Sequence, residues 1–155
     1  MFVSISWSFM DPAWLGPRHM RPCLYAYLHP RRDEILYIGV AKTGRGLTPS
    51  QTADRKALFT FLRRRLRLKS VRFLGSRLLT DARVSVTNEL LAQAQSLLVR
   101  RVRPRGNLAV GQPLISRPGL VVECGGNWPV PGRYVDRGNN PNSEHRRRVR
   151  WNEPA

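Results

Sequence analysis

The chain has 155 residues, with 27 lysines and arginines against 10 acidic residues and a formal net charge of +17. This length suits one domain with tails and excludes a multidomain protein. The charge attracts polyanions, of which nucleic acid is the commonest, although a basic surface kept for solubility would give the same composition. No apolar run approaches the roughly 20 residues that cross a membrane, so we expect a cytoplasmic protein without a membrane partner.

The first half of the chain predicts a hairpin followed by a basic helix. Residues 1–22 combine tryptophans and prolines without a sustained period, which predicts an irregular lead-in. Two apolar runs, 24–28 and 35–38, flank a polar turn and predict a β-hairpin. After a loop, with Ser50 or Thr52 as a helix N-cap, a helix is expected from about Asp54. Its apolar residues recur at three- and four-residue steps: Leu58, Phe61, Leu62 and Leu66.

The second half predicts a strand and another helix. Val84 and Val86 alternate with polar residues and predict a third strand. Thr87 or Asn88 can cap a helix that runs from about 89 to 103, with an apolar stripe on one side. Pro104 ends this helix because proline cannot continue it.

The C-terminal part predicts little regular structure. Residues 120–122 suggest a short edge strand, and from 125 onward Gly, Asn, Pro and Arg predict a flexible basic tail. The aromatic residues of this tail are expected to be disordered, or else to stack on bases: Trp128, Tyr134 and Trp151. The predicted boundaries are 1–22 for the lead-in, 23–123 for the domain and 124–155 for the tail.

Cysteines and histidines do not form a metal-ligand pattern. Cys23 and Cys124 lie far apart on apolar segments, and we expect them to be buried thiols in a reducing compartment. No two histidines share a ligand spacing. His29, at the end of a predicted strand, is a surface residue by default, with a catalytic base as the alternative.

Two separate segments resemble the signature of the GIY-YIG nuclease superfamily. Leu24-Tyr25 followed by Tyr37-Ile38-Gly39 resembles the two signature strands. Downstream, five residues stand at the spacing of the family's E-x-x-L-I-x-x-x-x-P-x-x-N segment: Gln95, Leu98, Val99, Pro104 and Asn107. The resemblance covers about residues 23–108. It implies a small α/β domain, an antiparallel three-stranded sheet flanked by helices, that cuts phosphodiesters with one divalent ion, Mg²⁺ or Mn²⁺.

The resemblance also implies roles for individual residues. Tyr25 and Tyr37 match the tyrosines that position and activate the attacking water, whereas without the motif they would be cross-strand packing. Gln95 stands where the family has its metal-binding Glu, and an amide is a much poorer ligand for a hard cation. Glu89 does not replace it, because six residues place it about 120° away around the helix.

The basic residues of the family pattern are displaced as well. Val40 follows Tyr37-Ile38-Gly39 where a lysine is common, and Lys42 comes two positions later. Leu47 stands near the place of the essential arginine, so Arg45 and Arg55 are the candidates, with Arg55 preferred at the helix start. Further contacts to nucleic acid are expected from Lys56, Arg63, Arg64, Arg67 and Asn107.

Three functions are consistent with these residues. The first is a GIY-YIG-like domain that binds DNA, or RNA, with cleavage impaired or lost through Gln95. The second is an active metal-dependent endonuclease, with the metal held by other ligands or with Gln95 an engineered replacement of Glu. The third is a basic scaffolding protein on RNA or on an acidic partner. The sequence does not specify the oligomeric state.

Overall fold

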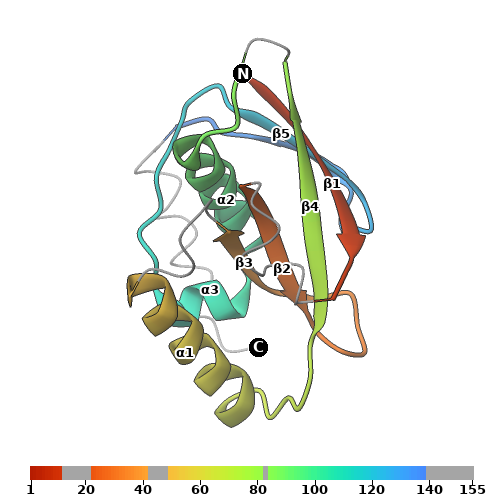
Figure 1. Cartoon of the computed structure of the whole chain (residues 1–155), viewed down its shortest axis with the longest axis vertical. Coiled ribbons are helices and arrows are strands. Elements are labelled where there is room, and N and C mark those ends of the chain that lie inside the picture. Colours follow the sequence, from red (N-terminus) through yellow and green to blue (C-terminus); the bar gives the residue numbers. More distant parts are fainter. Residues whose placement is uncertain (12–21, 42–48, 82–83, 139–155) are drawn as a thin grey trace, which may run out of the picture.

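A computed structural model describes residues 1–11, 22–41, 49–81 and 84–138, with the backbone alone for 49–52. The described chain is α/β, as predicted. Its elements, in chain order, are β1 (Phe2–Phe9), β2 (Cys23–Leu28), β3 (Ile35–Ala41), α1 (Pro49–Arg64), β4 (Arg72–Thr80), α2 (Asn88–Val102), α3 (Arg105–Val110), β5 (Val121–Gly126) and β6 (Gly132–Val135) (Figure 1).

The sheet has six strands, in the order β3-β2-β4-β1-β5-β6. All neighbours are antiparallel except β1 and β5, which are parallel. The predicted three-stranded sheet is therefore wrong in size. Strands β3, β2 and β4 do form a contiguous antiparallel group, but β4 continues to pair on its other side with β1.

Strand β1 corrects the prediction of an irregular lead-in. Val3, Ile5 and Trp7 are buried, and serines alternate with them. This period of two lets one face of the strand join the core. Trp7 stacks on Trp128 with ring centroids 4.4 Å apart. Residues 12–21 lie outside the described residues.

Strands β5 and β6 correct the prediction of a tail from residue 124. β5 is an inner strand and β6 is the edge. Trp128, in the connection, is only 2% exposed and donates from its indole nitrogen to the Tyr134 hydroxyl at 3.2 Å. These aromatic residues belong to the core rather than to a disordered tail. Residues 139–155, which include Trp151, lie outside the described residues.

The third strand is also displaced from its prediction. β4 spans Arg72–Thr80, whereas Val84 and Val86 precede α2 without strand structure. The second helix is confirmed: α2 begins after Thr87, whose side chain accepts a hydrogen bond from the Leu90 backbone. No helix in the described part of the chain is long and apolar enough to cross a membrane.

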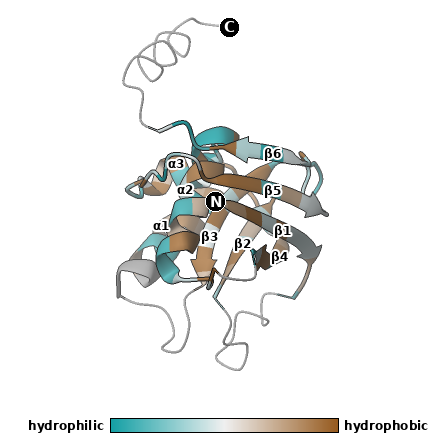
Figure 2. Ribbon diagram, turned by 90° about the horizontal axis from the view of Figure 1, so that it is seen from above, coloured by the Kyte–Doolittle hydropathy of each residue, from teal (hydrophilic) through white to brown (hydrophobic). Residues whose placement is uncertain are grey.

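Helices α1 and α2 cover opposite faces of the sheet. Leu24 and Ala26 of β2 pack into the core formed with α2, whereas Tyr25 and Tyr27 pack into the cluster formed with α1. This division follows from the alternation of side chains along a strand. Because β3 is covered on both sides, it is buried over most of its length, and Figure 2 shows it coloured mainly as hydrophobic.

A buried carboxylate ties the end of β6 to α2. Asp136 is 4% exposed and pairs with Arg100 at 2.8 Å. It also accepts hydrogen bonds from the Ser116 hydroxyl and from the backbone N–H groups of Arg117 and Gly138. Although burial opposes the charged form, these hydrogen bonds and Arg100 hold the pKa of Asp136 below its usual value.

Candidate nucleic-acid site around the paired tyrosines

Three tyrosines meet on the α1 side of β2 and β3. Tyr27 is the cross-strand partner of Tyr37, and Tyr25 lies opposite Gly39. The ring centroid of Tyr37 is 6.2 Å from that of Tyr25 and 6.3 Å from that of Tyr27. All three are buried, with 2% to 8% of each residue exposed. The structure therefore brings together the two tyrosines that the sequence singled out and adds Tyr27.

Gly39 makes room for the hydroxyl end of Tyr25. A Cβ atom at this position would lie 2.3 Å from Cζ and 2.5 Å from the hydroxyl oxygen of Tyr25. Real Cβ atoms do not approach other atoms so closely, so any side chain here would displace the ring. The close packing of the Tyr25 ring therefore explains why glycine occupies position 39 in the second signature strand.

The hydroxyl of Tyr37 is held by an amide from a distant segment. Gln112 lies just after α3, and its Nε2 donates to the Tyr37 hydroxyl at 3.1 Å and to Asp54 Oδ2 at 3.1 Å. Burial raises the pKa of Tyr37 to about 12, although hydrogen bonds from Gln112 and Tyr25 act in the opposite direction. Tyr37 is therefore a neutral phenol at physiological pH.

Arg55 brings positive charge to the cluster from the first half of α1. Burial is the main cause that raises the pKa of Tyr27, and the charge of Arg55 and its hydrogen bond to this hydroxyl oppose the rise. The guanidinium carbon also lies 5.6 Å from the centre of the Phe59 ring. Arg55 is exposed, so a ligand in solution can reach it.

Gln95 acts as a hydrogen-bond donor in this network. Its Nε2 donates to the Ile38 carbonyl at 2.9 Å and to Gln112 Oε1 at 3.3 Å. An amide fits this position because it faces two oxygen acceptors. A carboxylate would place a third oxygen against them.

This donor set does not fit a hard divalent cation. Such ions need several oxygen ligands, and carboxylates above all. Gln95 presents its amide nitrogen to the Ile38 carbonyl and to Gln112. Among the residues that the structure describes, Asp54 is the one carboxylate in this hydrogen-bond network, and its bond is to Gln112. The described residues also contain no group of three His, Cys, Asp or Glu that could hold a metal.

Asn107, which was predicted to contact nucleic acid, bonds in the structure to the backbone of β3. It is 4% exposed, its Oδ1 accepts from the Ile38 N–H at 2.8 Å, and its Nδ2 donates to the Ile38 carbonyl at 2.9 Å. The amide thus satisfies the outer edge of β3. At Gly106 a Cβ would lie 2.4 Å from the Leu36 carbonyl oxygen, so α3 packs directly on this edge.

The remaining predicted site residues fall into three groups. Lys42, Arg45 and Leu47 lie outside the described residues. Val40 packs with the core on the α2 side, away from the tyrosines. Four basic residues are exposed on α1 or just after it: Lys56, Arg63, Arg64 and Arg67.

His29 and the two cysteines complete the residues that the sequence singled out, and Cys23 lies two residues before Tyr25 on β2. The His29 ring accepts a hydrogen bond from the Arg31 backbone in the turn between β2 and β3. Cys23 and Cys124 are buried and free, as predicted.

Gln112 and Asp54 are the residues that the sequence analysis missed. In the sequence Asp54 stands only at an expected helix start, and no period or spacing distinguishes Gln112.

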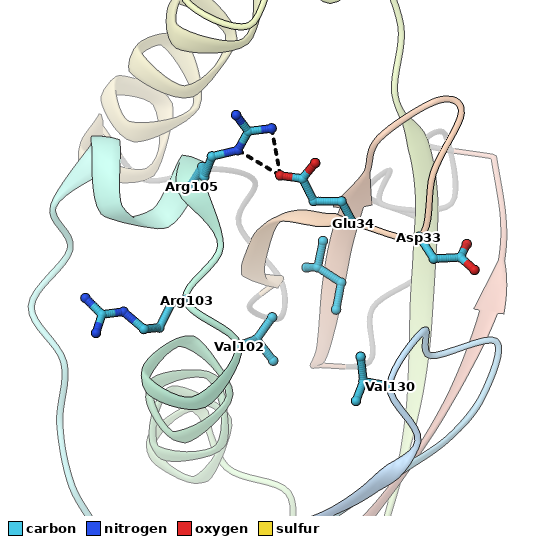
Figure 3. A pocket seen from close by; sticks show the side chains of 7 residues that line it. Asp33, Glu34, Val102, Arg103, Arg105 and Val130 are labelled. Atoms are coloured by element: carbon cyan, nitrogen blue, oxygen red, sulfur yellow. Dashed lines mark hydrogen bonds and ion pairs between the residues drawn. The ribbon is translucent and has the colours of Figure 1, made fainter. Parts of the chain in front are cut away.

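A shallow pocket of about 260 Å³ lies elsewhere, between the β2–β3 turn, the end of α2 and the loop before β6 (Figure 3). Ile35, Val102 and Val130 supply its apolar lining. At its rim the Glu34 carboxylate pairs with Arg105 at 2.7 Å and with Arg32 at 3.0 Å. The acid is thus neutralised within the protein, and no predicted site residue lines this pocket.

Comparison with known proteins gives no match to a family model, to a curated protein or to a solved structure.

Proposed function

We propose that the chain is a GIY-YIG nuclease-like domain that binds nucleic acid, DNA in the first place, with cleavage impaired or lost through Gln95. The proposal starts from the resemblance of the two tyrosine strands and of the helix-Pro-Asn segment. It is supported by three contacts within one cluster: the paired Tyr25 and Tyr37, the nearby Arg55, and Gln95 against the same strand.

The loss of cleavage rests on one observation, the direction of the Gln95 hydrogen bonds. The amide donates to the Ile38 carbonyl at 2.9 Å, so the network uses it as a donor and not as a metal ligand. A phosphodiesterase of this kind needs a metal ion to stabilise the charge of the transition state and the leaving oxygen. Without a carboxylate here, binding can remain while the rate falls by orders of magnitude.

Binding of nucleic acid is supported by the charge of α1 and the segment after it. No acidic residue occurs from Arg55 to Thr80, and none of the basic residues of this stretch is buried. Arg and Lys contacts to phosphate supply most of the affinity of non-specific binding. The partner is therefore a phosphate backbone, and binding needs no metal cofactor.

One observation favours the alternative of an active endonuclease. The carboxylate of Asp54 is linked to Tyr37 and Gln95 through a single side chain, because Gln112 forms hydrogen bonds with all three residues. A basic scaffolding protein on RNA or on an acidic partner is distinguished by competition, because it would not prefer duplex DNA.

The test is nicking of supercoiled plasmid in Mg²⁺ and in Mn²⁺, with three chains compared: wild type, Gln95→Glu, and Gln95→Glu with Tyr37→Phe. We expect the wild type to bind without cutting and Gln95→Glu to gain nicking that Tyr37→Phe removes. Nicking by the wild type would overturn the loss of cleavage. If none of the three chains nicks the plasmid while all three still bind DNA, Gln95 is not the reason for the loss of cleavage.

A further inference from the structure

The turn that ends α1 contains an arginine in a backbone conformation that favours glycine. Arg67 has a φ of 53°, in the left-handed region. The Leu68 N–H bonds to the Leu62 carbonyl at 3.0 Å, and both leucines pack in the cluster around the tyrosines. This bond joins residues one position further apart than the 6→1 bond of a Schellman motif, but the left-handed residue directly precedes the donor, a place where glycine is usual after a helix.

An arginine at this position is conformationally unfavourable, and no contact of its side chain in the described fold requires it. Its side chain is exposed and has no ion pair or hydrogen bond to any residue that the structure describes. A left-handed conformation brings Cβ too close to the following carbonyl oxygen, whereas glycine avoids this. Strained positions that the fold does not need are candidates for function.

The surroundings of Arg67 indicate which ligand it would meet. Lys56 and Arg63 lie on α1 at about 160° and 140° from Leu58, and so both point away from the core. Arg64 and Lys69 are exposed as well. Figure 1 shows the end of α1 at the bottom of the molecule, at a distance from α2 and β5. The surface there carries positive charge without acidic neighbours in the sequence.

The extent of this surface matches a stretch of nucleic-acid backbone. Arg55, beside the tyrosines, and Arg63 are eight residues apart, or about 12 Å along the helix axis. Measured along the axis of a DNA duplex, this length corresponds to about three to four nucleotide steps of 3.4 Å. The exposed basic residues of α1 and of the turn at Arg67 are thus spread over enough length to meet more than one phosphate.

We infer that Arg67 is a phosphate contact at the end of a backbone-binding track along α1, and that its left-handed conformation is kept for this contact. The inference rests on the proposed function and adds the surface that the nucleic acid follows. The contact is independent of sequence, because phosphates carry no base information.

The experiment compares Arg67→Gly, Arg67→Lys and Arg101→Gln in the full chain. Arg101 lies on α2, on the opposite side of the sheet, and its replacement removes the same charge there. Affinity for a short fluorescent duplex is measured by anisotropy between about 50 and 200 mM salt, and Tm is measured in parallel.

We expect Arg67→Gly to weaken binding about eightfold at 0.1 M salt and to reduce the slope of log K against log salt by about 0.9, the value of one released counterion. Its Tm should not fall, because glycine suits the left-handed turn. Arg67→Lys should keep the slope, and Arg101→Gln should bind as the wild type does.

Equal binding by wild type and Arg67→Gly would overturn this inference and leave the proposed function in place. A clear fall in Tm for Arg67→Gly would also overturn it, because the arginine would then serve the fold. Absence of binding by the wild type itself would refute the proposed function, and the inference with it.

Discussion

Replacing Gln95 by glutamate exchanges a hydrogen-bond donor for a carboxylate opposite a main-chain carbonyl. The variant loses the bonds to Ile38 at 2.9 Å and to Gln112 at 3.3 Å. Each such bond contributes about 0.5 to 1.5 kcal/mol net, and the carboxylate adds repulsion. We therefore expect the free energy of unfolding to fall by about 2 to 3 kcal/mol, or Tm by roughly 5 to 10 °C for a chain of this length.

The assay is thermal unfolding followed by circular dichroism, without metal and with added Mn²⁺. Asn88→Glu is the control, because it adds the same charge to α2 at its exposed N-terminal end. The control should unfold within about 1 °C of the wild type, since a carboxylate is favourable there. Mn²⁺ should restore part of the loss in Gln95→Glu alone. A Tm for Gln95→Glu within about 1 °C of the wild type would refute the assignment of Gln95 as a donor.

Three further outcomes follow from the described contacts. Gly39→Ala should lower the stability in urea by about 1 to 3 kcal/mol and change the near-UV circular dichroism, because Cβ would overlap the Tyr25 ring; an unchanged spectrum would contradict this. The pKa of Asp136 is lowered, so its carboxylate stabilises the fold above pH 4 and this contribution is lost as the pH falls further. The stability difference between wild type and Asp136→Asn should therefore be about 2 to 4 kcal/mol at pH 7 and shrink below pH 4, and a constant difference in urea titrations would count against it. Burial raises the pKa of all four tyrosines, that of Tyr37 to about 12, so absorbance at the tyrosinate band should stay low at pH 10 and rise only as the chain unfolds.

Elements with a local signal could be predicted from the sequence. The hairpin of β2 and β3 shows as two apolar runs around a polar turn, and α2 shows as an apolar stripe with Thr87 as its cap. Strand β1 also has a local signal, because Val3, Ile5 and Trp7 alternate with serines. The interpretation as a lead-in gave weight to the prolines that follow instead of to this alternation.

Other features depend on contacts between distant segments. The parallel pairing of β1 with β5 joins residues near 5 and near 124, and no local pattern specifies it. The same holds for Gln112, which reaches Tyr37 and Asp54 across 75 and 58 residues of sequence. A single sequence could indicate that Tyr25, Tyr37 and Gln95 belong to one site, but not that a second amide joins them.

Equilibrium binding with recovery of the DNA tests the central claim most directly. A labelled duplex is titrated with the wild-type chain in Mg²⁺ over a range of salt, and the same DNA is then run on a denaturing gel. Four to five phosphate contacts from the exposed basic residues of α1 and its end predict a slope of log K against log salt near −4, with the DNA intact. Cut DNA would contradict the loss of cleavage, and a slope near zero would contradict the phosphate-binding surface.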